Sequence, residues 1–592
     1  MRVMPAAPSR EPTARRAWSS RSIKPGRPGW TTRAGARALA ARAWAGHRLF
    51  IIVLTPAVLL RVDAELGYRW HAWFNDSFQY IQNTVHFNLD PTRVSGYSIW
   101  LKILQPLHTY AVVTILQHLM ALAVAVMIYA LARHRFRTPA WLATLATVPV
   151  LYDGFEIQLE HLILSDTLFL FLVMLAVLVL LWSPLRAAGG AGGAQVPWWR
   201  SSWARCALAG ALVGVSAIVR TTGLPLIPIF AVYLLLCFGM SRAGWRTLVS
   251  GVVAFVVLAV APVAGYAGWY DLQHGAFNTS ESTGVFLYSR VMTFADCAKM
   301  QLSPDLLSLC TTVPPAQRPI AQAYIWTAAS PLHRFPAPVF SALPNSLAQQ
   351  FAIKAIEAQP GAYARAVFDD TWRSFDWSRS VFPNAETYDE YLFGYQSVPI
   401  SSGHPVPGYS SSAAAYLAGG NPLTAVVDPF AGAIRVYQRY VWLPGTVYGL
   451  LLLAGLGAIV AGRRRVSVDA LLPWVSSVAL IVVPAATAEF DYRYVTTAVP
   501  FACLALAIAF GRRSAPAAVA TPDAGAAAEA AQPAEGAQSA QSAEASGAGP
   551  VNGTSVPSGG ATSLPRRVPG GGSGNGTVQS GHDERDFAPD TS

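Results

Sequence analysis

An aspartate flanked by aromatic residues is the first candidate for chemistry in this sequence. Asp76 lies within WFNDSFQY, the stretch from residue 73 to residue 80. A carboxylate in these surroundings can take a proton from a hydroxyl group while the aromatic rings exclude water and stack on a sugar. Asn75, Asp76 and Ser77 are also favourable helix N-cap residues, so a structural role for Asp76 is the alternative.

Three arginines supply positive charge that such an acid could face. Arg93 lies in TRVSGY (residues 92–97), Arg220 lies between two apolar runs, and Arg493 lies in EFDYRY (residues 489–494). Arginine can bind a phosphate through two parallel hydrogen bonds. At a membrane boundary it can equally contact lipid headgroups or pair with a nearby acid. We predict that the three arginines form a phosphate cradle facing Asp76.

A third cluster is acidic and runs from residue 152 to residue 166. On a helix, Asp153, Glu156 and Glu160 would share one face, while His161 and Asp166 would project elsewhere. Three neighbouring carboxylates repel unless a cation, an arginine or sugar hydroxyls meet them. A divalent metal is left open here, but the stretch has no tight acid-x-acid pair and no His-x-x-His spacing. A water-exposed rim is the alternative.

The composition indicates which elements must position these residues. Of the 592 residues, 53% are hydrophobic and only 13% are charged, against about 25% charged in a typical soluble domain. A soluble protein, a collagen, a coiled coil and a wholly disordered chain are therefore excluded. Five cysteines in this length form no disulfide scaffold and show no zinc-like spacing. The charge deficit predicts an integral membrane protein.

Apolar runs separated by short polar breaks predict about ten transmembrane helices. A spanning helix needs about 20 residues, so several of the runs are short. The runs cover residues 49–60, 107–131, 141–151, 162–182, 204–219, 224–240, 248–266, 441–460, 470–483 and 495–510. The first run could instead be the core of a secretory signal, but no small-x-small cleavage site follows it, so we predict an uncleaved helix.

The distribution of charge predicts the orientation in the plasma membrane. Residues 1–48 contain eleven basic residues and one acid, and basic loops stay on the cytoplasmic side. Alternate loops are also basic, at residues 133–137, 186–205, 241–246, 463–465 and 512–513. The opposite loops carry the acids Asp63, Glu65, Asp76, Asp90, Asp153, Glu156, Glu160, Glu489 and Asp491. Both termini are therefore predicted to be cytoplasmic, and Asp76 extracytoplasmic.

These patterns divide the chain into five parts. A basic, disordered segment (1–48) precedes an N-terminal transmembrane module (49–268), whose first external loop (66–105) carries Asp76. An extracytoplasmic segment (269–435) and C-terminal transmembrane helices (436–513) follow. The tail (514–592) has hardly any large apolar residue and is predicted to be disordered. Cys297 and Cys310 lie in the external segment, where we expect a disulfide; two free thiols are the alternative.

The combination of these motifs resembles the GT-C superfamily of polytopic glycosyltransferases. The resemblance covers residues 49 to 513 and is carried by the Asp76 loop, the SGY motif that ends at Tyr97, EHLILSDTLF (160–169), VRTTGL (219–224) and DYRY (491–494). It looks closest to the group that holds protein O-mannosyltransferases and the transferases that add aminoarabinose to lipid A. It implies an all-α, GT-C-like bundle with an extracytoplasmic loop domain.

The resemblance also implies roles for individual residues. Asp76 would be the general base, and Arg93, Arg493 and Arg220 would bind the donor phosphate. Substrate contacts are assigned to Glu160, Asp166, Asp491 and Tyr97. Members of the family often carry a second acid after the first, and Ser77 at that position weakens the case for a paired carboxylate or a metal ligand in the loop. The metal ligands stay unknown, and a divalent metal is the one cofactor left open.

The function that the resemblance implies is transfer of a hexosyl or pentosyl group from a polyprenyl-phosphate carrier, with inversion, to an extracytoplasmic glycan, lipid or protein. The sequence has no phosphate-binding loop of nucleotide enzymes, and no nucleic-acid partner is expected. The alternatives are a transporter or flippase of lipid-linked sugars and a non-catalytic envelope assembly protein. Transporters often show repeated halves with interrupted helices, and neither is found in this sequence.

Overall fold

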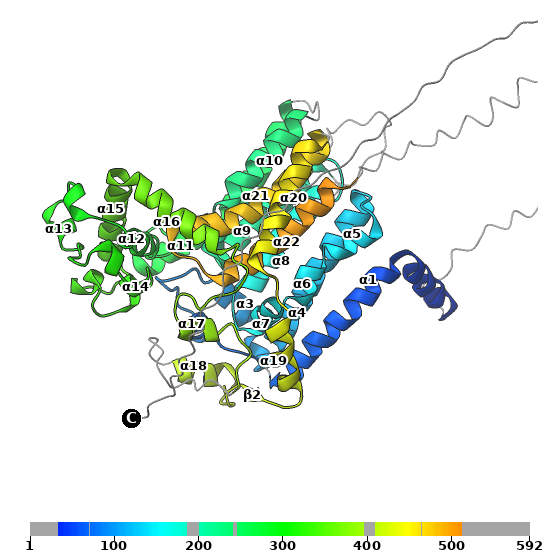
Figure 1. Ribbon diagram of the computed structural model, residues 1–592, viewed down its shortest axis with the longest axis horizontal. Coiled ribbons are helices and arrows are strands. Elements are labelled where there is room, and N and C mark those ends of the chain that lie inside the picture. The colour runs from blue at the N-terminus through cyan, green and yellow to red at the C-terminus, as the bar shows by residue number, and fades with distance from the viewer. Residues whose placement is uncertain are drawn as a thin grey trace, which may run out of the picture. The chain divides into compact units, whose positions relative to one another are not determined.

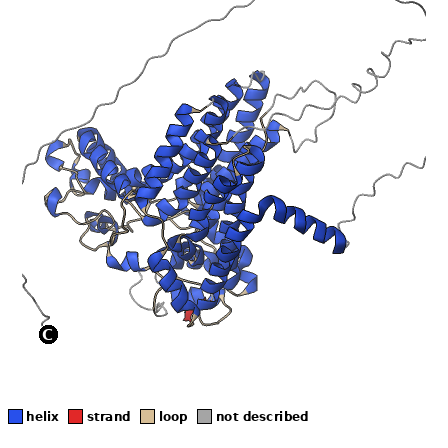
Figure 2. Cartoon of the chain, turned by 45° about the vertical axis from the view of Figure 1, so that its right-hand side comes forward, coloured by secondary structure: helices blue, strands red, loops and turns tan. Residues whose placement is uncertain are grey.

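The computed structural model describes residues 33–69, 71–185, 201–240, 245–395, 409–462 and 464–511. Nearly all regular structure in these ranges is helical (Figure 2). The exception is a short antiparallel pair, β1 (Tyr68–Arg69) and β2 (Ala425–Val426). The tail predicted to be disordered and most of the predicted basic loops lie outside the described residues.

Every predicted apolar run that the structure describes forms a helix, but the predicted count of ten spans is not confirmed. Six helices are long and apolar enough to cross a membrane, or seven if one bent pair counts as a single span, among the residues described. Three of the spans are the whole helices α9 (Ser202–Val219), α11 (Trp245–His274) and α22 (Tyr492–Ala509). The span Ala111–Arg135 is α4 (Ala111–Ala130) with its π-helical end, and the span Val466–Thr487 lies within α21 (Arg464–Thr487). The span Thr221–Gly239 combines a short turn with α10 (Leu226–Met240) except its last residue.

The remaining apolar runs form helices that are not among the six candidate spans. The bent pair is α19 (Phe430–Tyr440) and α20 (Gly445–Ala461), with an angle of 57° between them. The third and fourth runs form α5 (Ala140–Leu145) with α6 (Val148–Tyr152), and α8 (Asp166–Leu181). The first run lies in α1 (Arg33–Gly67), which starts within the segment 1–48 that was predicted to be disordered.

The helix α9 lies within the bundle of helices (Figure 1), and close backbone contact fixes its position there. A Cβ atom added at Gly210 would lie 2.2 Å from the carbonyl oxygen of Phe255, and one at Gly214 would lie 2.3 Å from that of Ala259. Small residues allow membrane helices to approach in this way. The end of α9, where Arg220 begins the turn into α10, is therefore held firmly against α11.

The segment between α11 and α19 has a hydrophobic core of its own. Val285 and Tyr288 of α12 (Thr283–Met292) pack with Phe351 of α15 (Ala342–Ala358). A disulfide joins Cys297 to Cys310, as expected, with the Cα atoms 6.3 Å apart.

The other helices are α2 (Asn75–His86), α3 (Gly96–Leu104), α7 (Gly154–His161), α13 (Pro304–Leu307), α14 (Ala323–Trp326), α16 (Pro360–Arg373), α17 (Ala385–Asp389) and α18 (Tyr409–Tyr416).

Candidate active site

Asp76 lies in the first turn of α2 and does not cap this helix. Phe74 is the N-cap residue, and the Ser77 hydroxyl accepts a hydrogen bond of 2.9 Å from the Phe74 N–H. The Asp76 carboxylate instead accepts from two arginines through one oxygen. Its Oδ2 lies 2.5 Å from Arg93 Nη1 and 2.7 Å from Arg493 Nη1. The electrostatic pairing predicted for Asp76 is therefore present in the structure.

The loop between α2 and α3 holds Arg93 beside the end of α9. Gly96, three residues later, is packed so closely that a Cβ atom would lie 2.4 Å from the carbonyl oxygen of Ile218. The Tyr266 hydroxyl of α11 accepts a hydrogen bond of 3.0 Å from the Ser95 N–H. Arg93 Nε has no hydrogen-bond partner in the described part of the chain. A buried donor of this kind is rare and leaves Arg93 able to donate to a ligand.

The other two arginines are each paired with one of the predicted acids. Arg493 lies in the first turn of α22, and its Nε is 2.8 Å from Oδ2 of Asp491, the N-cap residue of that helix. Asp166, the first residue of α8, forms an ion pair with Arg220. The Arg220 guanidinium also lies over the ring of Tyr494, 5.1 Å from its centroid. Asp166 and Asp491 therefore hold arginines in place.

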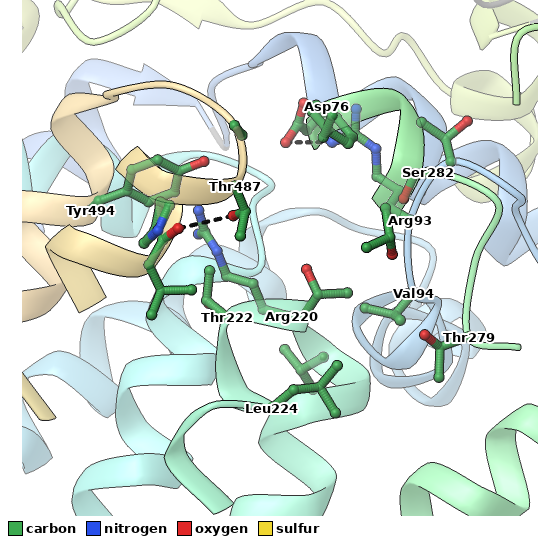
Figure 3. A pocket seen from close by; sticks show the side chains of 18 of the residues that line it. Asp76, Arg93, Val94, Arg220, Thr222, Leu224, Thr279, Ser282, Thr487 and Tyr494 are labelled. Carbon is green, nitrogen blue, oxygen red and sulfur yellow. Dashed lines mark hydrogen bonds and ion pairs between the residues drawn. The ribbon is translucent and has the colours of Figure 1, made fainter. Parts of the chain in front are cut away.

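One cavity of about 390 Å³ brings Asp76 together with all three predicted arginines. Figure 3 shows Asp76, Arg93 and Arg220 around this cavity, with Tyr494 beside Arg220. Its volume lies in the range of small-ligand sites, about 300–1,000 Å³. Three guanidinium groups and one carboxylate line the cavity, while the carboxylates of Asp166 and Asp491, which pair with Arg220 and Arg493, lie outside the lining. The lining also includes Tyr80, Thr92, Val94, Val219, Thr221, Thr222, Leu224, Pro225, Thr279, Ser282, Thr283, Phe286, Val483, Pro484, Thr487, Ala488 and Tyr494.

The two guanidiniums determine the protonation of Asp76. Burial by itself would raise the pKa of this carboxyl, but Arg93 and Arg493 outweigh burial and hold the pKa well below its usual range. Asp76 is therefore ionised throughout the physiological pH range. A carboxylate in this state can accept a proton, although its low pKa reduces its strength as a base.

A second acid beside Asp76 is not apparent from the sequence. Glu390 follows α17, and its Oε2 accepts a hydrogen bond of 3.2 Å from the Asn75 N–H. Burial raises the pKa of Glu390 to about 8, and the nearby Asp76 charge acts in the same direction. This contact joins residues 315 positions apart, and no motif around Glu390 indicates it.

None of the four residues predicted to contact the substrate, Glu160, Asp166, Asp491 and Tyr97, is in the cavity lining. Tyr97 is fully buried, and its hydroxyl donates to Gln117 Oε1 at 2.7 Å. Glu160 is also fully buried, with Oε1 and Oε2 accepting from Arg61 at 2.6 and 2.9 Å. Arg61 lies in α1 and was not among the predicted site residues. The structure thus places Tyr97 and Glu160 in packed, hydrogen-bonded surroundings.

The predicted acidic face of residues 153–160 is met largely by arginines. Asp153 is the N-cap residue of α7, and its Oδ1 accepts from the Phe155 N–H at 2.9 Å. Its Oδ2 lies 3.2 Å from Arg379 Nη2, while Arg61 pairs with Glu160. Guanidinium groups therefore neutralise Asp153 and Glu160, whereas Oε2 of the buried Glu156 has no hydrogen-bond partner among the described residues.

Comparisons with known proteins give a weak likeness. No family model and no curated protein matches the chain. Solved structures of the oligosaccharyltransferase from Archaeoglobus fulgidus do match. The apo form is 15% identical with a TM-score of 0.36, covering 78% of this chain and 51% of that one. AglB in complex with an inhibitory peptide and a dolichol-phosphate is also 15% identical, with a TM-score of 0.38, covering 78% of this chain and 50% of that one. This chain spans about half the length of these proteins, and the values are too low to assign a family.

Proposed function

We propose that this protein is an integral membrane glycosyltransferase that moves a sugar from a polyprenyl-phosphate carrier to an extracytoplasmic acceptor. One observation carries the proposal: a carboxylate and three guanidinium groups, Asp76 with Arg93, Arg220 and Arg493, line one cavity at the ends of apolar helices. The donor phosphate needs cations, and the acceptor hydroxyl needs a proton acceptor. The cavity offers both.

The arginines would hold the carrier phosphate as the leaving group. Arg93 and Arg493 share one oxygen of Asp76, and Arg93 Nε has no hydrogen-bond partner among the residues described. A phosphate that enters the cavity can therefore take guanidinium donors without leaving Asp76 unpaired. Positive charge already in place stabilises the negative charge that develops on the phosphate oxygen as the glycosidic bond breaks.

Asp76 would accept the proton of the acceptor hydroxyl. The acceptor oxygen forms a bond to the anomeric carbon, the bond from that carbon to the phosphate oxygen breaks, and its electron pair leaves with the phosphate. The proton passes to Asp76. Attack opposite the leaving phosphate inverts the anomeric centre.

The rest of the lining suits a lipid-linked donor and an acceptor from outside the bundle. Apolar residues at the ends of the candidate membrane helices, such as Leu224, Pro225 and Val483, would contact the isoprenoid. Thr279, Ser282 and Phe286, from the segment 269–435, would lie on the acceptor side. The acceptor is a glycan, a lipid or a protein. In this proposal the cavity opens on the extracytoplasmic side of the plasma membrane, and both termini are cytoplasmic.

The test uses the purified full-length protein with radiolabelled polyprenyl-phosphate mannose and, separately, polyprenyl-phosphate arabinose. Envelope extracts serve as the acceptor, and products are separated by chromatography. We expect label to move from the carrier to an acceptor with the wild type and not with Asp76→Asn. Equal transfer by Asp76→Asn would contradict a general-base role for Asp76. Movement of intact labelled carrier across proteoliposomes, without bond cleavage, would indicate a flippase instead.

A further inference from the structure

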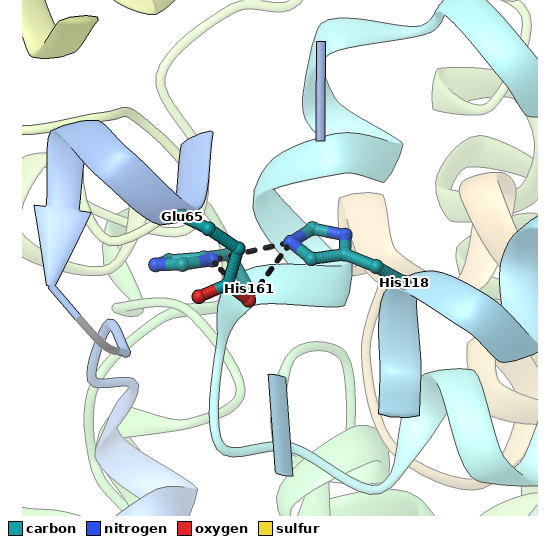
Figure 4. A group of neighbouring side chains, drawn as sticks. All are labelled: Glu65, His118 and His161. Atoms are coloured by element: carbon teal, nitrogen blue, oxygen red, sulfur yellow. Dashed lines mark hydrogen bonds and ion pairs between the residues drawn. The ribbon is translucent and has the colours of Figure 1, made fainter. Parts of the chain in front are cut away.

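We propose that Glu65, His118 and His161 bind a divalent transition metal ion at a site separate from the arginine-lined cavity, and that Zn²⁺ is the ion that fits this site best. Glu65 lies in the last turn of α1, His118 lies within α4, and His161 is the last residue of α7. One potential ligand atom from each lies within 4.8 Å of the other two. Figure 4 shows both imidazole rings directed at the Glu65 carboxylate. None of the three residues lines the cavity.

The distances between the ligand atoms match a tetrahedral ion. His118 Nε2 lies 3.2 Å from His161 Nδ1, and Glu65 Oε1 lies 3.6 Å from the first and 3.8 Å from the second. Ligands bound to tetrahedral Zn²⁺ at about 2.0–2.2 Å lie about 3.3–3.6 Å from one another. Octahedral ligands at about 2.1 Å would lie closer, at about 3.0 Å. Two histidines and one carboxylate are also a ligand set that Zn²⁺ uses.

Each imidazole ring forms a hydrogen bond through the nitrogen that faces away from this site. The other nitrogen of each ring, with its lone pair, therefore faces into the site. His161 Nε2 lies 2.7 Å from the carbonyl oxygen of Tyr68, which can only accept, so Nε2 carries the proton. His118 Nδ1 lies 2.7 Å from Oε2 of Glu160, which also accepts from Arg61, so Nδ1 carries the proton. In neutral rings His118 Nε2 and His161 Nδ1 are then both unprotonated. A carboxylate or carbonyl behind a ligating histidine is typical of metal sites.

A positive charge is needed where these three atoms meet. Two imidazole lone pairs and a carboxylate oxygen repel one another at these distances. Within the described ranges no lysine or arginine forms an ion pair with Glu65, whose side chain is 12% exposed. The Thr114 hydroxyl lies beside Glu65 but brings no charge. A proton could bridge only one pair of these atoms, whereas a metal ion binds all three.

The metal would join the start of the Asp76 loop to two helices of the bundle. Backbone hydrogen bonds attach this loop to the end of α7: the Ala72 N–H donates to the His161 carbonyl at 3.0 Å, and the Ile163 N–H donates to the Ala72 carbonyl at 3.1 Å. Asp76 follows Ala72 by four residues. An ion held by α1, α4 and α7 would therefore stabilise the segment from which α2 and Asp76 extend.

The experiment measures metal binding by full-length protein in detergent. Protein stripped with a chelator is reloaded with Zn²⁺, freed of unbound metal by gel filtration, and analysed by mass spectrometry of the elements. Co²⁺ loading gives a visible absorption spectrum that reports tetrahedral coordination. Glu65→Gln and His161→Gln remove single ligands. His71→Gln is the matched control, because His71 is a buried histidine of the same region outside the cluster.

We expect about one Zn²⁺ per wild-type chain, a tetrahedral Co²⁺ spectrum, and a melting temperature that falls on chelation and returns with Zn²⁺. Glu65→Gln and His161→Gln should lose more than tenfold in affinity, and Glu160→Gln, which affects His118 indirectly, about 10- to 100-fold. His71→Gln should bind like the wild type. Wild-type protein that retains no metal, or a Co²⁺ spectrum that is not tetrahedral, would overturn the proposal, and neither depends on the folding of a variant.

Discussion

Two arginine–carboxylate clusters in this molecule have the same chemistry and very different surroundings. In the cavity the Arg93 and Arg493 side chains are 23% and 14% exposed, and Arg93 has an unused donor among the described residues. In the second cluster Arg61 and Glu160 are 3% and 0% exposed. Arg61 donates to both oxygens of Glu160 and to the carbonyls of Ala57, Val150 and Leu151. Access and unused donors, rather than charge alone, distinguish a site that can take a ligand from one that holds helices together.

The comparison changes the interpretation of individual residues. A buried ion pair that is fully hydrogen-bonded has no capacity left for a substrate, and removing one partner leaves an uncompensated charge. Glu160 lies in such a pair, whereas Asp76 faces a cavity. We therefore expect substitutions in the cavity to affect turnover and substitutions at Arg61 and Glu160 to affect stability.

The largest effect is expected for Asp76→Asn. Loss of a general base should reduce the rate of transfer by about 10²- to 10⁴-fold, measured as initial rates at saturating donor. The amide keeps the shape of the side chain but not the charge that pairs with Arg93 and Arg493, so the melting temperature should fall as well, and rates are compared per folded protein below that temperature. Asp305→Asn, in an exposed acid outside the cavity lining, is the control and should keep its rate. A rate for Asp76→Asn within threefold of the wild type would contradict the role assigned to the cavity.

The second prediction addresses the closed cluster. Arg61→Met should cost about 3–5 kcal/mol in the free energy of unfolding, because Glu160 is left buried without its partner. Unfolding in detergent measures this cost. Arg365→Met is the matched control: Arg365 is 84% exposed and lies 3.9 Å from Asp369, so its loss should cost about 0–1 kcal/mol. Equal stability of the two variants would remove the distinction between the clusters.

The third prediction separates the donor from the acceptor. Arg93→Ala should raise the KM for the polyprenyl-phosphate donor about 10- to 100-fold, since a hydrogen bond to a charged group contributes about 1.5–3 kcal/mol. The KM for the acceptor should stay within about twofold. Arg93→Lys should recover part of the loss, because it keeps the charge but not the paired donors. A rise confined to the acceptor KM would show that Arg93 contacts the acceptor and would contradict its role in binding the donor phosphate.

The fourth prediction concerns the pH dependence of stability. The pKa of Glu390 is raised from 4.5 to about 8 in the folded protein. The folded state therefore binds this proton more tightly than the unfolded state, and stability falls as pH rises from about 4.5 to about 8. Glu390→Gln should remove this part of the dependence and should be relatively more stable near pH 8 than near pH 5. Melting curves from pH 5 to pH 9 would show it, and parallel curves for the two proteins would contradict it.

The sequence predicted what depends on local pattern and composition. Apolar runs predicted the helices, because burial of a 20-residue stretch needs no knowledge of its neighbours. The motifs around Asp76, Arg93, Arg220 and Arg493 predicted four residues that do line one cavity. The predicted count of ten spans is not confirmed, since α8, at 16 residues, falls short of the length of a span, and α19 and α20 are bent relative to each other.

Long-range contacts explain most of what the sequence did not indicate. Arg61 and Glu160 are 99 residues apart, and Glu390 contacts a residue 315 positions away. His118 lies 43 residues from His161, so no local spacing marks the proposed metal site. The sequence pattern of a polar residue after an apolar run is the same whether that residue contacts a ligand or a side chain from a distant part of the chain. Only the packing of the helices decides between the two.

The ion pair between Asp76 and Arg493 joins residues 417 positions apart, and this separation bears on biosynthesis. Arg493 lies in the first turn of α22, which is made after the other described helices. A chain still on the ribosome therefore has Asp76 and Arg93 but lacks the second guanidinium that Asp76 requires. If the proposed function holds, a nascent chain would have an incomplete cavity, and turnover could begin only after the final described helix has been made.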